Sequence, residues 1–145
     1  MKSSIMKLSP CGVCKMYNSH MTNYYPTPEI AAGMARLVEH AQSVVDAYWE
    51  QQGYTHALSP LVEVESIGAS YAKVVQRDRN LDGTLGGAGV YCFVAMKDSN
   101  TKGMDVVKEG DIFKAASWKA PAKHARGNIW TDLSKCSRWG MEYLR

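Results

Sequence analysis

The spacing of apolar residues predicts one long helix in the first half of the chain. Between Thr27 and Gly53, apolar side chains recur every three or four residues, which is the period of an amphipathic helix. These positions are Ile30, Met34, Leu37, Val38, Ala41, Val44, Val45 and Tyr48. Thr27 suits the N-cap, Pro28 the first helical position and Gly53 the C-terminal stop, so we expect the helix to fill this interval.

After Pro60 the apolar period changes from helical spacing to two, which is typical of strands. In the stretch LVEVESI, Val62 and Val64 alternate with Glu63 and Glu65. The predicted strands cover residues 61–67, 70–77 (a continuation or a second short strand), 90–97 and 111–118, with loops at 78–89 and 98–110. A short helix is expected after Pro121, over residues 121–127, before an irregular tail.

These elements predict an α+β fold, because hairpin connections favour antiparallel pairing and the long helix must cover one face of the sheet. We expect one long amphipathic helix packed on a three-stranded antiparallel sheet, a short C-terminal helix and irregular arms at both ends. Residues 1–26 form the expected N-terminal arm, and residues 27–145 form one domain. With 46% hydrophobic residues in a chain of 145, this domain can bury a core.

The apolar runs are also too short for a membrane span of roughly 18 residues, and the N-terminus lacks a signal-peptide pattern. We therefore expect a soluble cytoplasmic protein without a membrane partner.

Positive charge is concentrated at the C-terminal end. The chain carries a net charge of +3, but residues 113–145 carry +5 and residues 1–112 carry −2. Acidic side chains are absent between Asp111 and Asp132. On the predicted helix, Lys119, Lys123 and Arg126 would share one face, which indicates an anionic partner. The candidate contact residues are Lys114, Lys119, Lys123, His124, Arg126, Trp130 and Arg138.

Aromatic residues accompany this basic stretch and the central strand. Alternation along residues 111–118 places Trp118 on the face expected beneath the long helix, so its ring is predicted to be structural. Tyr91 and Phe93 are expected on one face of the central strand. That face is either core or a platform on which bases stack.

The motif CGVC is the first candidate metal site. Cys11 and Cys14, with His20 nearby, supply three ligands of the kind that zinc prefers. The alternatives are a redox pair, which lacks the expected following helix, and two thiols in an irregular arm.

The stretch DRNLDGTLGGAG is the second candidate metal site. Asp78, Asn80 and Asp82 match the first half of a calcium-binding loop, but Gly89 occupies the position of the bidentate glutamate. A glycine-rich hairpin turn accounts for the same residues.

The block GDIFKAASWKAPAKHARGNI, preceded by VYCFVAMKD, resembles a C-terminal block in small proteins of tailed bacteriophages that have no established activity. The resemblance covers roughly residues 70–130 and implies a viral origin, and hence an infected host cell as the setting. A weaker similarity of layout relates the chain to double-stranded RNA-binding domains, whose last helix grips phosphates with lysines. Two features depart from that pattern. Gly127 would cut the last helix short, and the apolar stripe of the long helix leaves no obvious face for the minor groove.

These features favour a small phage-type accessory protein that binds an anionic partner, with nucleic acid as the leading candidate, through a basic C-terminal face. The alternative is a protein-interaction module, either a virion component or an inhibitor of a host enzyme, that docks the same surface on an acidic protein. The four histidines suggest no catalytic pair, so we do not expect an enzyme, nor a cofactor other than zinc. The oligomeric state and the identity of the partner stay open.

Overall fold

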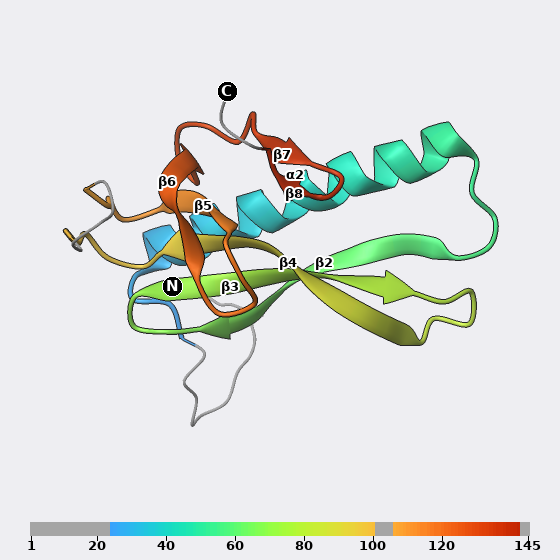
Figure 1. Ribbon diagram of the computed structural model, residues 1–145, viewed down its shortest axis with the longest axis horizontal. Helices are drawn as coiled ribbons and strands as arrows, with labels where there is room; N and C mark the ends of the chain where they lie inside the picture. Colours follow the sequence, from blue (N-terminus) through green and yellow to red (C-terminus); the bar gives the residue numbers. More distant parts are fainter. Residues whose placement is uncertain (1–23, 101–105, 143–145) are drawn as a thin grey trace.

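The computed structural model describes residues 24–100 and 106–142, where a single helix lies against a five-stranded sheet (Figure 1). The elements are α2 (Pro28–Gln52), β2 (Leu58–Ile67), β3 (Tyr71–Arg79), β4 (Leu85–Ala95), β5 (Asp111–Ala115), β6 (Pro121–Asn128), β7 (Cys136–Ser137) and β8 (Gly140–Met141). The predicted N-terminal arm lies outside the described residues as far as residue 23. Within the described residues, no helix is long and apolar enough to cross a membrane.

The predicted helix is confirmed at both ends. The Thr27 hydroxyl accepts a hydrogen bond from the backbone N–H of Ile30 at 3.1 Å, and Pro28 occupies the first turn. Gly53 ends the helix in the left-handed conformation, with φ 68°. The buried stripe runs from Ile30 to Val45.

The sheet is an antiparallel meander in the order β2-β3-β4-β5-β6, and β7 pairs with β8 in a separate two-stranded sheet. The predicted three-stranded sheet with a short C-terminal helix is therefore wrong, and the described fold is mostly β. Residues 61–67 and 70–77 belong to two strands that turn at residues 68–70. The irregular C-terminal arm is also a wrong prediction, because β7 and β8 form a hairpin there.

Residues 121–128 form β6 instead of a helix because they complete the sheet beside β5. Ala125 pairs with Phe113, and Gly127 pairs with Ile112. Pro121 is tolerated at the first residue of this edge strand. A Cβ on Gly127 would lie 2.3 Å from the Asp132 carbonyl oxygen, so this glycine allows a close backbone approach and does not end a helix.

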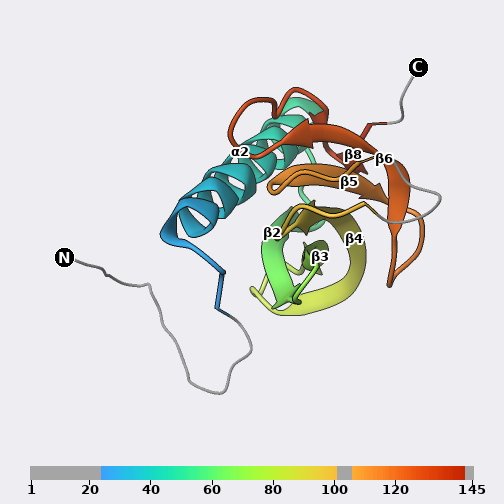
Figure 2. The same cartoon turned by 90° about the vertical axis from the view of Figure 1, so that its left-hand side faces the viewer.

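The sheet buries side chains on both faces. On the face that α2 covers, the core includes Leu37, Val74 and Ile112. Figure 2 shows that the sheet is strongly curled, and its other face encloses a smaller cluster that includes Phe93 and Phe113.

A β-bulge at Tyr91 explains a further correction. Val74 pairs with Cys92 and Val75 with Val90, so Tyr91 is an extra residue on β4. Tyr91 therefore packs on the α2 side, while Phe93 packs on the opposite side. The predicted shared face is wrong, and both rings are core, because they are only 1% and 4% exposed.

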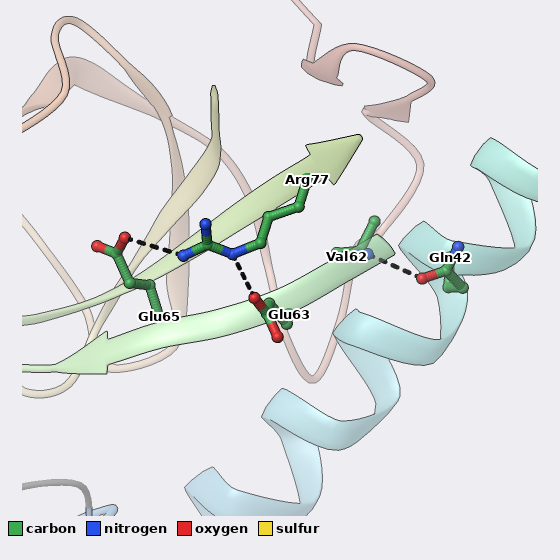
Figure 3. Close-up of polar contacts among 5 residues, drawn as sticks. All are labelled: Gln42, Val62, Glu63, Glu65 and Arg77. Atoms are coloured by element: carbon green, nitrogen blue, oxygen red, sulfur yellow. Dashed lines mark hydrogen bonds and ion pairs between the residues drawn. The ribbon is translucent and has the colours of Figure 1, made fainter. Parts of the chain in front are cut away.

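Polar side chains join α2 to β2 and β2 to β3 (Figure 3). The Gln42 side chain accepts a hydrogen bond from the N–H of Val62 and donates one to the Pro60 carbonyl, both at 2.8 Å. These two bonds satisfy backbone groups of the edge strand. Arg77 on β3 forms ion pairs with Glu63 and Glu65 on β2.

Candidate functional site

The β5–β6 hairpin carries the exposed cations of the predicted basic face. We call β5, the turn 116–120 and β6 the basic hairpin. Lys119 lies in the turn and Lys123 on β6, and both are exposed. Among the described residues, neither ammonium group makes an ion pair or a hydrogen bond. His124 is also exposed on this edge strand.

Two further cations of the predicted face are held by the C-terminal segment. The Lys114 ammonium donates a hydrogen bond to the Met141 carbonyl at 3.0 Å. The Arg126 guanidinium donates to the carbonyls of Glu142, at 3.3 Å, and His124, at 2.6 Å. The bonds to Met141 and Glu142 attach β8 and the residue that follows it to the sheet, so both side chains have structural roles.

Trp118 does not lie beneath the helix, and the prediction that it is packed there is wrong. Strand β5 ends at Ala115, and the turn breaks the alternation on which the prediction depended. The ring is 44% exposed and lies over the Lys73 ammonium, which is 4.2 Å from the ring centroid. Lys73 projects from β3 on the face turned away from α2, where it forms an ion pair with Glu65 of β2.

The remaining predicted contact residues lie elsewhere. Trp130 donates a hydrogen bond to the Glu29 carbonyl at 3.3 Å. A Cβ added to Gly33 or Gly110 would lie 3.1 or 2.7 Å from the Trp130 ring, so this ring joins the start of α2 to the sheet. Arg138 lies in the β7–β8 hairpin, with its guanidinium carbon 4.2 Å from the ring centroid of Tyr48.

Trp139, the residue after Arg138, lines a pocket of about 710 Å³, which we call the aromatic pocket. Its aromatic wall comes from three segments, namely the last turn of α2, the α2–β2 loop and the β7–β8 turn. The wall residues are Trp49, Tyr54, His56 and Trp139. Trp49 and Tyr54 meet edge to face with centroids 4.7 Å apart, and the Trp49 N–H donates to the Ala57 carbonyl at 3.0 Å. The Trp139 ring is 67% exposed.

The floor of the aromatic pocket is the glycine-rich start of β4. Gln76 on β3 pairs with Gly89, so the two residues share a face, and Gly87 and Asp78 share it by alternation. The Gln76 amide donates a hydrogen bond to the Arg138 carbonyl at 3.0 Å. Among the described residues, the Asp78 carboxylate makes no hydrogen bond or ion pair.

The β7–β8 hairpin is fixed against β4, which positions the outer wall of the pocket. The Tyr91 hydroxyl donates to the Ser137 carbonyl at 2.6 Å, and burial raises the pKa of this phenol. A Cβ on Gly140 would lie 2.8 Å from the Tyr91 carbonyl oxygen. At the inner end of the wall, a hydrogen bond with Tyr48 raises the pKa of Tyr54.

The predicted metal ligands fall into two groups. Cys11, Cys14 and His20 lie outside the described residues. In the β3–β4 turn, Asp82 accepts hydrogen bonds from the N–H and hydroxyl of Thr84, which lower the pKa of its carboxyl group. Asn80 donates to the Thr84 hydroxyl. No group of three or more metal-ligating side chains is present in the described stretches of the chain, and calcium binding stays a prediction.

The described residues form a small protein in which one helix packs against a curled antiparallel sheet. Residues 31–140 match a family described as "Family of unknown function (DUF7717)", and the chain belongs to that family. No curated protein and no solved structure matches the chain.

Proposed function

We propose that the protein binds nucleic acid through the basic hairpin, with Lys119 and Lys123 contacting phosphates. The observation that carries the proposal is the pair of exposed ammonium groups, which make no contact with any acid in the described structure. Acidic side chains are also absent from residues 112–131. A surface shaped only for solubility usually mixes both signs.

Trp118 and the remaining cations support the same proposal. The exposed indole directly precedes Lys119 in the turn and offers a surface on which a base can stack. His124 adds a further exposed polar side chain to this edge, while Lys114 and Arg126 add positive potential from their fixed positions. Arg138 and Trp130 lie elsewhere, so the proposed contact area includes the basic hairpin but neither of these two residues.

The block at residues 110–129 resembles phage proteins, which supports the proposal that the protein acts in a phage-infected cell. In a bacterial cell infected by a tailed phage, the phosphate-rich partners are phage or host DNA and RNA. Contacts made by lysines at phosphates carry no sequence information, so we expect binding without strong sequence preference.

A binding titration tests the proposal. Fluorescently labelled single-stranded and duplex DNA and RNA are titrated at about 50 mM salt, where phosphate contacts are strongest. We expect binding by the native protein and much weaker binding by Lys119→Glu with Lys123→Glu. The matched control, Lys97→Glu with Lys108→Glu, makes the same charge change beyond the other end of β5. Equal loss in both variants, or no binding by the native protein, contradicts the proposal.

A protein partner is the second candidate, because β6 is an edge strand next to the exposed Trp118. An extended peptide or an acidic surface could add to such an edge. Capture from a bacterial lysate that survives nuclease treatment, and is lost in Trp118→Ala, favours this candidate.

Lysines on edge strands also hinder pairing between chains. If Lys119→Glu with Lys123→Glu self-associates but binds nucleic acid like the native protein, the two lysines serve to prevent pairing between chains.

A further inference from the structure

Gly87 and Gly89 have no explanation within the fold itself. Neither residue has a positive φ, so the backbone does not require glycine at these positions. A Cβ on either would meet nothing within 4 Å, so packing does not require it. Glycine in a strand weakens the strand, and often marks a place where a ligand or another backbone approaches closely.

The aromatic pocket lies directly above these glycines. Bare backbone therefore faces a wall of aromatic side chains across a space of about 710 Å³. This volume falls in the range of sites for small organic ligands. Trp139 and Tyr54 keep 67% and 39% of their surfaces exposed, which leaves ring faces available for stacking.

The polar groups of the pocket select the ligand further. The Asp78 carboxylate and the side-chain oxygen of Gln76 are hydrogen-bond acceptors on the floor, and they suit the N–H groups on the edge of a base. The Arg138 guanidinium lies 4.2 and 5.2 Å from the ring centroids of Tyr48 and Trp139. This positive charge lies beside Trp139, so it favours an anionic substituent at that end of the pocket.

We propose that the aromatic pocket binds a nucleotide, with the base between Trp139 and the glycine floor and the phosphate toward Arg138. This site lies on the α2 side of the sheet, whereas Trp118 lies over the opposite side. The pocket is thus separate from the basic hairpin and goes beyond the function proposed above. A free nucleotide and an unpaired base of a single strand share this chemistry.

Calorimetric titration with adenosine 5′-monophosphate tests the site. We expect saturable binding by the native protein, and binding about five- to hundredfold weaker in Trp139→Ala, which is the range for loss of one base–aromatic stack. Arg138→Gln should reduce the preference for adenosine 5′-monophosphate over adenosine. Lys119→Glu with Lys123→Glu should bind the nucleotide like the native protein, so failure of one proposal is distinguishable from failure of the other.

Gly87→Val is the decisive variant, because an added Cβ meets nothing within 4 Å and the branched side chain covers the floor on which the base would lie. We expect an unfolding midpoint no lower than that of the native protein, because valine favours a strand more than glycine does, and no nucleotide binding. Ser66→Val is the matched control, because Ser66 is an exposed residue of β2 that does not line this pocket. This variant should bind the nucleotide normally. If a trinucleotide binds much more tightly than the mononucleotide, the ligand of the pocket is an unpaired base of a single strand and not a free nucleotide. Unchanged binding in Gly87→Val, no binding by the native protein, or binding of choline in place of the nucleotide overturns the proposal.

Discussion

The basic hairpin and the aromatic pocket differ in how their side chains are held. The pocket wall is fixed by ring contacts, such as that of Trp49 with Tyr54, and by the packing of Gly140 against β4. The lysines of the hairpin extend from a turn and an edge strand into solvent. A preorganised wall loses little conformational freedom on binding, whereas long flexible cations act mainly through charge. The two regions should therefore respond differently to truncation, pH and salt.

Truncation of a core ring at the base of the hairpin should have the largest effect on stability. Phe113 is 1% exposed, and Phe113→Ala should lower the free energy of unfolding by about 3–5 kcal/mol. Trp118→Ala, at the tip of the same hairpin, should cost less than about 1 kcal/mol because its ring is 44% exposed. Urea denaturation measures both. Equal costs would show that Trp118 is packed as firmly as the core.

Alkaline pH should destabilise the side of the sheet that carries the pocket. Burial raises the pKa of Tyr25 to about 12 and that of Cys136 to about 11, and it raises the pKa of Cys92 as well. Below their ordinary values of 10.0 and 9.0 these groups are protonated in both states. As pH rises from 9 toward 12, the unfolded chain releases these protons first.

The free energy of unfolding should therefore fall over this window, by up to about 1.4 kcal/mol per pH unit for each group. Thermal unfolding as a function of pH measures the slope. Cys92→Ala with Cys136→Ala should flatten it between pH 9 and 10, below the ordinary pKa of the tyrosines. An unchanged slope in that interval would contradict the assignment to the thiols.

Loss of one hydrogen bond should loosen the pocket more than the hairpin. In Tyr91→Phe the Ser137 carbonyl loses its donor, which should cost about 1 kcal/mol. Amide hydrogen exchange should then quicken in β7 and β8 and stay unchanged in the turn 116–120. Uniform protection across both regions would show that this bond does not hold the β7–β8 hairpin.

The sequence was sufficient for elements whose signals are local. The cap at Thr27, the stop at Gly53 and the apolar stripe between them predicted α2, and alternation predicted most of β2 and β3. Strand β6 was missed because its alanines and cations favour a helix locally, and pairing with β5 overrides that preference. The Tyr91 bulge was missed because no local residue signals which strand carries the extra position.

The basic hairpin was predicted in its residues but not in its geometry, since charge clusters in sequence whereas exposure depends on the fold. Arg138 and Trp130 were separated from it by tertiary contacts that begin on α2. The aromatic pocket could not be predicted from spacing because its lining comes from distant segments around Trp49, Gln76, Gly87 and Trp139. Its one sequence signal was the excess of glycines at residues 86–89, which a turn alone does not need.

The salt dependence of nucleic-acid binding tests the central claim most directly. Each phosphate neutralised contributes about −0.7 for single strands to the slope of the logarithm of affinity against that of salt concentration. Removal of two phosphate contacts should therefore make the slope of Lys119→Glu with Lys123→Glu shallower by about 1.4. The control, Lys97→Glu with Lys108→Glu, should keep the native slope. A native slope in the hairpin variant, or an equal change in both variants, would contradict phosphate binding by the basic hairpin.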